Sequence, residues 1–119
     1  MNTPQIHGQR LLASLQALGQ IGALPGGGVN RLALTEADGQ GRDWVVARMG
    51  ELGLRVEVDA IGNIFGSLPG TQDLPPVMVG SHIDTVRTGG LYDGNYGVLA
   101  GLEVVAALHE SGQIGRAHV

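Results

Sequence analysis

Residues 77–108 constrain the fold more than any other part of the sequence. They begin with a short continuous apolar run at 77–80 (VMVG), which is typical of a strand covered on both faces of a sheet. A glycine-rich loop follows, and residues 98–108 are then apolar on nearly every side apart from Glu103, as in a buried helix. A buried strand that leads through a loop into a buried helix indicates an α/β fold.

Two more helices are predicted upstream. Residues 9–18 carry an apolar stripe at helical spacing, formed by Leu11, Leu12, Leu15 and Leu18. Residues 36–52 predict a second helix, because Thr35 and Asp38 have the spacing of a capping box and Gly53 supplies a stop signal.

A strand pair is predicted between the second helix and the apolar run. Residues 54–58 alternate between apolar and charged side chains, and the turn signal Gly62-Asn63 leads into a second strand at 64–68. Residues 69–76 then have the composition of a loop. The order helix, helix, strand pair, strand, helix again indicates an α/β fold.

Composition excludes several classes of function. The net charge is -4 and the arginines are scattered, so no basic face is expected to bind nucleic acid. The sequence has no cysteine, so any metal must be bound by histidine and carboxylates. No signal-peptide pattern and no apolar run of membrane-spanning length is present, which predicts a cytoplasmic protein without a membrane partner.

The last residues differ from the rest of the chain. The segment 114–119 (IGRAHV) has the sequence expected of a translated sequencing adapter. We therefore predict a non-native tail there, and we exclude His118 from the chemistry.

His82 and Asp84 are the first candidates for a functional site. They lie one residue apart at the end of the predicted strand, so both side chains would project to the same side, where ligands gather in α/β folds. This spacing suits a metal site in which His82 binds the ion and Asp84 orients the ring. A polar strand end without function is the more common reason for such a pair when it is considered alone.

Asp93 is the third candidate. It lies in the loop 89–95 (GGLYDGN), from which a carboxylate can return to the strand end and bridge two cations. An aspartate just before a helix is more often an N-cap, and that role would be favoured if Asp93 were considered alone.

The residues around these candidates closely resemble a known signature. Residues 79–86 (VGSHIDTV) and 89–104 (GGLYDGNYGVLAGLEV) are similar to the GSHxDTV and GGxxDGxxGVLAGLEV motifs of the hydantoinase/carbamoylase amidohydrolases. That family includes N-carbamoyl-L-amino acid hydrolases, allantoate amidohydrolases and β-ureidopropionases. The resemblance covers about residues 31–108, and its upstream motifs are 31–35 (RLALT), 42–44 (RDW), 53–54 (GL) and 59–66 (DAIGNIFG).

The resemblance implies a role for each candidate. His82 would be a ligand of one metal ion, Asp93 the carboxylate that bridges two ions, and Asp84 the residue that orients His82. The cofactors would be two divalent ions, zinc or manganese, with cobalt or nickel also possible. Residues 1–113 would be the N-terminal portion of a truncated catalytic α/β domain like that of the metallo-exopeptidases. In the family this domain is interrupted by a lid and dimerisation domain, which is absent here.

The resemblance also implies a reaction and shows what this chain lacks. Family members hydrolyse a carbamoyl or ureido C–N bond in a small molecule, with metal-activated water and a glutamate base, and the parent protein is expected to be a homodimer. Glu103 and Glu110 do not match the family's paired glutamates in their motif context. We therefore expect this chain, as a fragment, to be inactive alone.

Two other hypotheses are open from the sequence. A dipeptidase, aminoacylase or deacetylase of the same superfamily would also carry a His-x-Asp pair and a bridging aspartate. A non-catalytic α/β module would have Asp93 as a helix cap and His82 as a surface side chain. The metal hypothesis requires His82 and Asp93 to lie within ~5 Å of each other, since bonds to a metal are each near 2 Å. The fragment hypothesis requires the helix at 98–108 to be incompletely covered.

Overall fold

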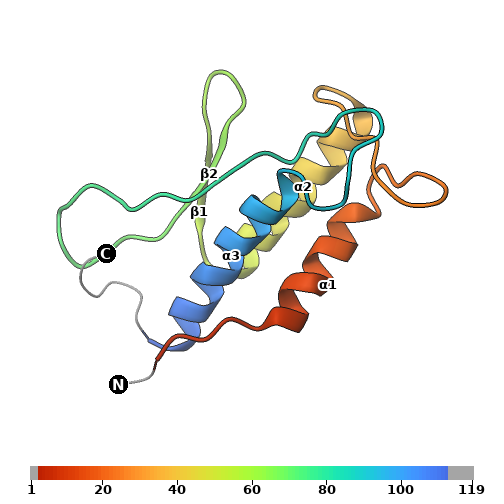
Figure 1. The fold of residues 1–119 in the computed structure, drawn as a ribbon. Coiled ribbons are helices and arrows are strands. Elements are labelled where there is room, and N and C mark those ends of the chain that lie inside the picture. Colours follow the sequence, from red (N-terminus) through yellow and green to blue (C-terminus); the bar gives the residue numbers. More distant parts are fainter. Residues whose placement is uncertain (1–2, 113–119) are drawn as a thin grey trace.

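The computed structural model describes residues 3–112, so the predicted tail at 114–119, with His118, lies outside the described residues. Its elements, in chain order, are α1 (Gly8–Gly19), α2 (Glu36–Glu51), β1 (Arg55–Val58), β2 (Ile64–Ser67) and α3 (Asn95–Glu110). The three predicted helices and the strand pair are thus confirmed, and the last helix begins at Asn95 rather than at Val98. Helix α1 packs along α3, and the β1–β2 hairpin packs on α2 and projects away from α1 (Figure 1).

The hydrophobic core connects all three helices. It consists of aliphatic side chains from α1, α2, α3 and the residue before β1, namely Leu11, Leu15, Leu18, Val45, Met49, Leu54, Leu99 and Leu102. Leu12 was predicted to share this face, but it is 44% exposed. It follows Leu11 by about 100° around the helix, which takes it out of the interface with α3.

A capping interaction starts α2 as the sequence predicts. The Asp38 backbone N–H donates to the Thr35 hydroxyl at 3.3 Å, and the Asp38 carboxylate accepts from the Leu34 backbone N–H at 3.0 Å. The return bond goes to Leu34 rather than to Thr35, because Leu34 adopts a left-handed backbone conformation with φ 68°. This turn brings the segment before α2 back toward the helix.

The hairpin between β1 and β2 is closed by Asp59. Its Oδ1 atom accepts the backbone N–H groups of Ile61 and Asn63, and its Oδ2 atom accepts the Asn63 side-chain amide at 2.8 Å. These hydrogen bonds, led by the Asn63 amide, hold the pKa of Asp59 below its ordinary value. Gly62 has φ 95°, which the turn requires. Gly62 and Asn63, which match a family motif, therefore have a structural role in this loop.

The predicted strand at residues 77–80 is wrong. No backbone pairing includes these residues, and Val77, Met78 and Val79 are 81%, 71% and 67% exposed. A strand needs a neighbour that bonds its N–H and C=O groups, and β1 and β2 pair with each other. Among residues 3–112, no third strand lies beside this segment. An apolar sequence of strand type is consequently left open to solvent.

Helix α3 is not covered on all sides. Leu99, Leu102 and Ala106 are buried, whereas Tyr96 and Val104 are 55% and 45% exposed. The radius of gyration is 15.1 Å, against roughly 13 Å for a compact chain of this length. Within residues 3–112, no helix has the length and apolar character needed to cross a membrane.

An ion pair attaches the N-terminal segment to α3. The Glu103 carboxylate, only 4% exposed, accepts two hydrogen bonds from the Arg10 guanidinium at 2.8 and 2.7 Å and one from the His7 backbone N–H. Arg10 also binds Glu110 at 2.7 Å. Arg10 holds the pKa of Glu103 below its ordinary value, because it bonds to the charged form of the carboxyl.

We predict that the Arg10–Glu103 pair stabilises the fold in a pH-dependent way. Since the folded-state pKa of Glu103 is depressed, its contribution is fully present above the unfolded pKa and is lost as the pH falls through the folded pKa. Glu103→Gln should lower the free energy of unfolding at pH 7 by about 2 kcal/mol, the scale of hydrogen bonds to charged groups. Urea unfolding at pH 7 and at stepwise lower pH measures this. A difference between the two proteins that stays constant into strong acid would contradict it.

Candidate functional site

The three candidate residues lie together beside the start of α3. His82 Nε2 is 4.0 Å from Asp93 Oδ2, and His82 Nδ1 is 3.3 Å from Asp84 Oδ1. The separation of His82 and Asp93 is within the limit that the metal hypothesis sets. The side chains of His82, Asp84 and Asp93 are 50%, 47% and 79% exposed, so the cluster is open on one side.

The orientation of the His82 ring is determined mainly by a backbone group. Its Nδ1 atom is 2.9 Å from the carbonyl oxygen of Asp84, closer than to the carboxylate of the same residue. A carbonyl can only accept, so this hydrogen bond requires the proton on Nδ1. In the neutral ring with this proton, Nε2 carries the free electron pair and faces Asp93, which is the arrangement a histidine needs to bind a cation. The sequence indicated that Asp84 would orient His82, but not that its backbone carbonyl would make the shorter contact.

Asp93 is not the cap of α3. The N-cap residue is Gly94, and no side chain caps this end of the helix. The alternative in which Asp93 serves only as the N-cap of α3 is therefore contradicted.

Glycines bring the His82 segment against α3. A Cβ atom at Gly94 would lie 2.5 Å from both Nδ1 and the carbonyl oxygen of His82. One at Gly97 would lie 2.7 Å from Cβ of Ser81, and one at Gly101 would lie 3.0 Å from a methyl group of Val79. The segment thus crosses α3 where no side chain intervenes. The spacing of three and four residues along one helical face was the sequence signal for this contact, and our prediction missed it.

The donor atoms of this site suit a divalent ion but do not complete its coordination. Zinc binds imidazole nitrogen and carboxylate oxygen at about 2.0–2.2 Å, which puts two ligands of a tetrahedral ion roughly 3.4 Å apart. The 4.0 Å gap between His82 and Asp93 is close to that value. Within the described ranges, no group of three or more His, Cys, Asp or Glu side chains is arranged to hold an ion. His82 and Asp93 therefore fit as part of a ligand set.

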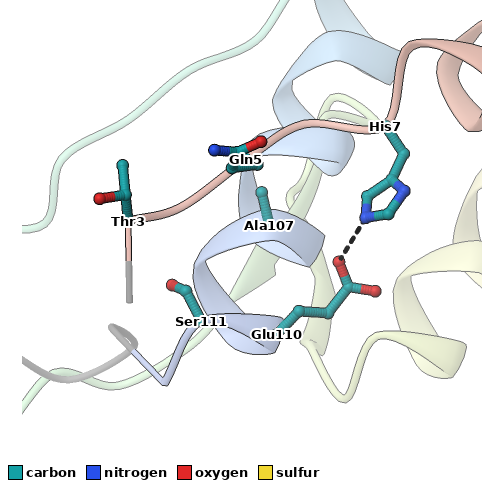
Figure 2. Close-up of a pocket in the computed structure, with 6 residues that line it drawn as sticks. All are labelled: Thr3, Gln5, His7, Ala107, Glu110 and Ser111. Carbon is teal, nitrogen blue, oxygen red and sulfur yellow. Dashed lines mark ion pairs between the residues drawn. The ribbon is translucent and has the colours of Figure 1, made fainter. Parts of the chain in front are cut away.

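A pocket at the other end of α3 is a separate feature. It lies between the N-terminal segment and the last turns of α3, and its lining is mostly polar: Thr3, Gln5, His7, Ala107, Glu110 and Ser111 (Figure 2). His7 and Glu110 approach to 3.8 Å there. The length of α3, about 24 Å at 1.5 Å per residue, separates this pocket from His82.

Comparison with known proteins identifies relatives of this chain. No family model matches it. The N-carbamoyl-L-amino acid amidohydrolase of Geobacillus stearothermophilus is 46% identical over 110 residues, which is 92% of this chain and 27% of that protein. The allantoate amidohydrolase of Bacillus subtilis is 45% identical over 98 residues, which is 82% of this chain and 24% of that protein.

A solved structure with the same fold supports the relationship. A hydantoinase/carbamoylase family amidase from Burkholderia ambifaria superposes with a TM-score of 0.91 at 47% identity, over 95% of this chain and 28% of that one. In sequence and in fold, the chain is similar to one part of each of these proteins. It belongs to the hydantoinase/carbamoylase family, as the signature motifs indicated, and it spans about a quarter of the length of these relatives.

We predict that Gly94→Ala disrupts the site. Gly94 has φ 72°, a conformation that costs a residue with a Cβ about 1–2 kcal/mol, and the added methyl group would displace the His82 ring. The free energy of unfolding should fall by at least that amount.

The matched control for this variant is Gly50→Ala. Gly50 lies exposed in α2, and a Cβ there meets no atom within 4 Å. Since alanine favours helix over glycine, this variant should be neutral or more stable by up to about 1 kcal/mol. Thermal or urea unfolding of both variants is the measurement, and equal effects at the two glycines would show that the Gly94–His82 contact is unimportant.

Proposed function

We propose that the full-length protein is a metal-dependent hydrolase that cleaves the C–N bond of N-carbamoyl amino acids or related ureido compounds. The observation that carries this proposal is the approach of His82 Nε2 to Asp93 Oδ2 at 4.0 Å, with the ring held by Asp84. The relatives named above are hydrolases of N-carbamoyl-L-amino acids and of allantoate. Their substrates share a carbamoyl or ureido group, which sets the class of compound proposed here.

In this proposal the three residues have distinct tasks. His82, through Nε2, and Asp93, through its carboxylate, would help to hold the divalent ions. Asp84 keeps the Nδ1 proton in place and so keeps Nε2 free. Two zinc or manganese ions, with cobalt or nickel as substitutes, would supply Lewis-acid polarisation of the substrate and acidification of water.

The general base is expected outside residues 3–112. Glu103, halfway along α3, and Glu110, its last residue, are both bound to Arg10. Neither is free to take a proton from a water molecule near Asp93. The remaining metal ligands and the base are accordingly proposed to come from other parts of the full-length protein.

Replacement of His82 tests the proposal. In the full-length protein, His82→Ala should reduce the metal-dependent release of ammonia from N-carbamoyl amino acids or allantoate by at least about 10²-fold, since a metal ligand is removed. His109→Ala is the matched control, because His109 is exposed near the end of α3, and it should leave the rate unchanged. Turnover that survives His82→Ala, or that needs no Mn²⁺ or Zn²⁺, would overturn the proposal.

The 119-residue chain alone should release no ammonia above background in the same assay, with or without Mn²⁺ or Zn²⁺. The reason is that, among residues 3–112, His82 and Asp93 provide only part of a ligand set and both glutamates of α3 are bound to Arg10. Metal-dependent turnover by this chain would contradict the expectation that the base lies elsewhere.

Substrate choice separates the related hypotheses. Dipeptides and N-acetyl amino acids in the same assay would be preferred if the protein were a dipeptidase, aminoacylase or deacetylase of the wider superfamily. The cytoplasmic location and the homodimeric parent remain predictions from the sequence and the resemblance.

A further inference from the structure

His82 and Asp93 both lie on irregular backbone. Residues 77–85 and 89–93 form neither helix nor strand, so no ladder of backbone hydrogen bonds sets the distance between the two side chains. Isolated backbone bonds join this region to the segment before α2: Val29 and Gly89 exchange two bonds at 2.9 Å, and the Thr85 N–H donates to the Arg31 carbonyl at 2.7 Å. The separation of the candidate ligands must therefore depend on a few particular contacts.

The Arg31 side chain contacts both segments. Its Nε donates to the carbonyl oxygen of Ile83, the residue between His82 and Asp84, at 2.9 Å. Its Nη2 donates to the Asn95 side-chain oxygen, two residues after Asp93, at 2.9 Å. One rigid guanidinium thus connects Ile83, which follows His82, with Asn95, which lies two residues after Asp93.

Further hydrogen bonds fix the guanidinium in place. Nη1 donates to the carbonyl oxygens of Leu18 and Ile21 at the end of α1, at 2.9 and 2.6 Å. The backbone N–H of Arg31 donates to the Thr85 hydroxyl at 2.7 Å. Gly41 of α2 lies against the aliphatic stem, where a Cβ would approach Cδ of Arg31 to 2.9 Å. The group is therefore anchored to α1 and enclosed by α2.

Because Arg31 is buried, its charged group needs these hydrogen bonds. The residue is 0% exposed, as is Asn95, and the partners of its side chain are carbonyl oxygens rather than a carboxylate. Burial lowers the pKa of Arg31, while Asp38 and Asp84 oppose that shift, and the group stays charged. A buried charge that loses a partner is strongly destabilising. Movement of Ile83 or Asn95 away from Arg31 would break one of these bonds and therefore destabilise the folded state.

We propose that Arg31 is a positioning residue that holds the His82 segment and the Asp93–Asn95 turn at a fixed separation and thereby sets the metal affinity of the site. This inference rests on the proposed function, because it assumes that His82 and Asp93 bind metal. Arg31 would touch neither metal nor substrate. Lysine could keep the charge but could not reach Ile83, Asn95 and the end of α1 at the same time, since it lacks the planar fork.

The test is the zinc affinity of the full-length protein, measured by competition with a chromophoric chelator at a temperature where each variant is folded. Arg31→Lys should weaken zinc binding by about 10- to 100-fold, the range seen when groups that orient metal ligands are changed. Asn95→Ala removes the Arg31 bond on the Asp93 side, together with the bond from the Asn95 amide to the Leu91 carbonyl, and should also weaken zinc binding. Because the two variants share one hydrogen bond, the double variant should lose less than the sum of the two effects.

Arg10→Lys is the matched control. Arg10 also binds a buried group, Glu103, which lies halfway along α3, eight residues after Asn95. This variant should lower the melting temperature and leave the zinc affinity unchanged, so loss of stability is distinguished from loss of positioning. If Arg31→Lys does not fold, Asn95→Ala decides the question by the same measurement.

The zinc measurements distinguish failure of this inference from failure of the proposed function. Zinc affinity that is equal in the wild type, Arg31→Lys and Asn95→Ala would overturn the role of Arg31 and leave the proposed function standing. Additive effects of Arg31→Lys and Asn95→Ala would also overturn it, because the two residues would then act separately. A full-length wild-type protein that binds no Zn²⁺ or Mn²⁺ would overturn the proposed function together with this inference.

Discussion

The hydrogen bonds of the buried Arg31 guanidinium are the interaction on which the arrangement of this chain depends. They join the end of α1, the start of α3 and the segment that carries His82, three parts that are distant in sequence. A charge buried among carbonyl oxygens is tolerated only when its N–H groups are satisfied. Within the part of the chain that the structure describes, no buried side-chain nitrogen or oxygen lacks a partner. The polar centre is therefore complete although the hydrophobic core around it is small.

Close backbone approach is the second constraint. The segment that carries His82 reaches α3 because Gly94, Gly97 and Gly101 leave room for it. Arg31 opposes separation of the two segments, and the glycines permit their contact. The candidate site thus combines irregular backbone, which lets polar groups converge, with a helix that serves as a rigid base.

The chain exposes apolar surface, and it spans only about a quarter of the length of its relatives. Val77, Met78 and Val79 have the sequence of a buried strand and yet face solvent, and one side of α3 exposes Tyr96 and Val104. The relatives are about four times as long as the matched region, which is 27% of one and 24% of another. Apolar surface of this extent is typical of a face that packs against further structure.

The sequence by itself determined the elements with local signals and the candidate residues. The Thr35 cap, the stripe of Leu11, Leu15 and Leu18, and the Gly62-Asn63 turn act over a few residues, so their patterns were sufficient for prediction. Motif resemblance singled out His82, Asp84 and Asp93. Only the tertiary structure decided that residues 77–80 stay unpaired, that the Asp84 carbonyl holds His82, and that Arg31 connects the two loops. The unpaired segment and the Arg31 contacts depend on residues far apart in sequence, which periodicity and spacing do not encode. The bond between His82 and the Asp84 carbonyl is local, but it forms on irregular backbone where the sequence predicted the end of a strand.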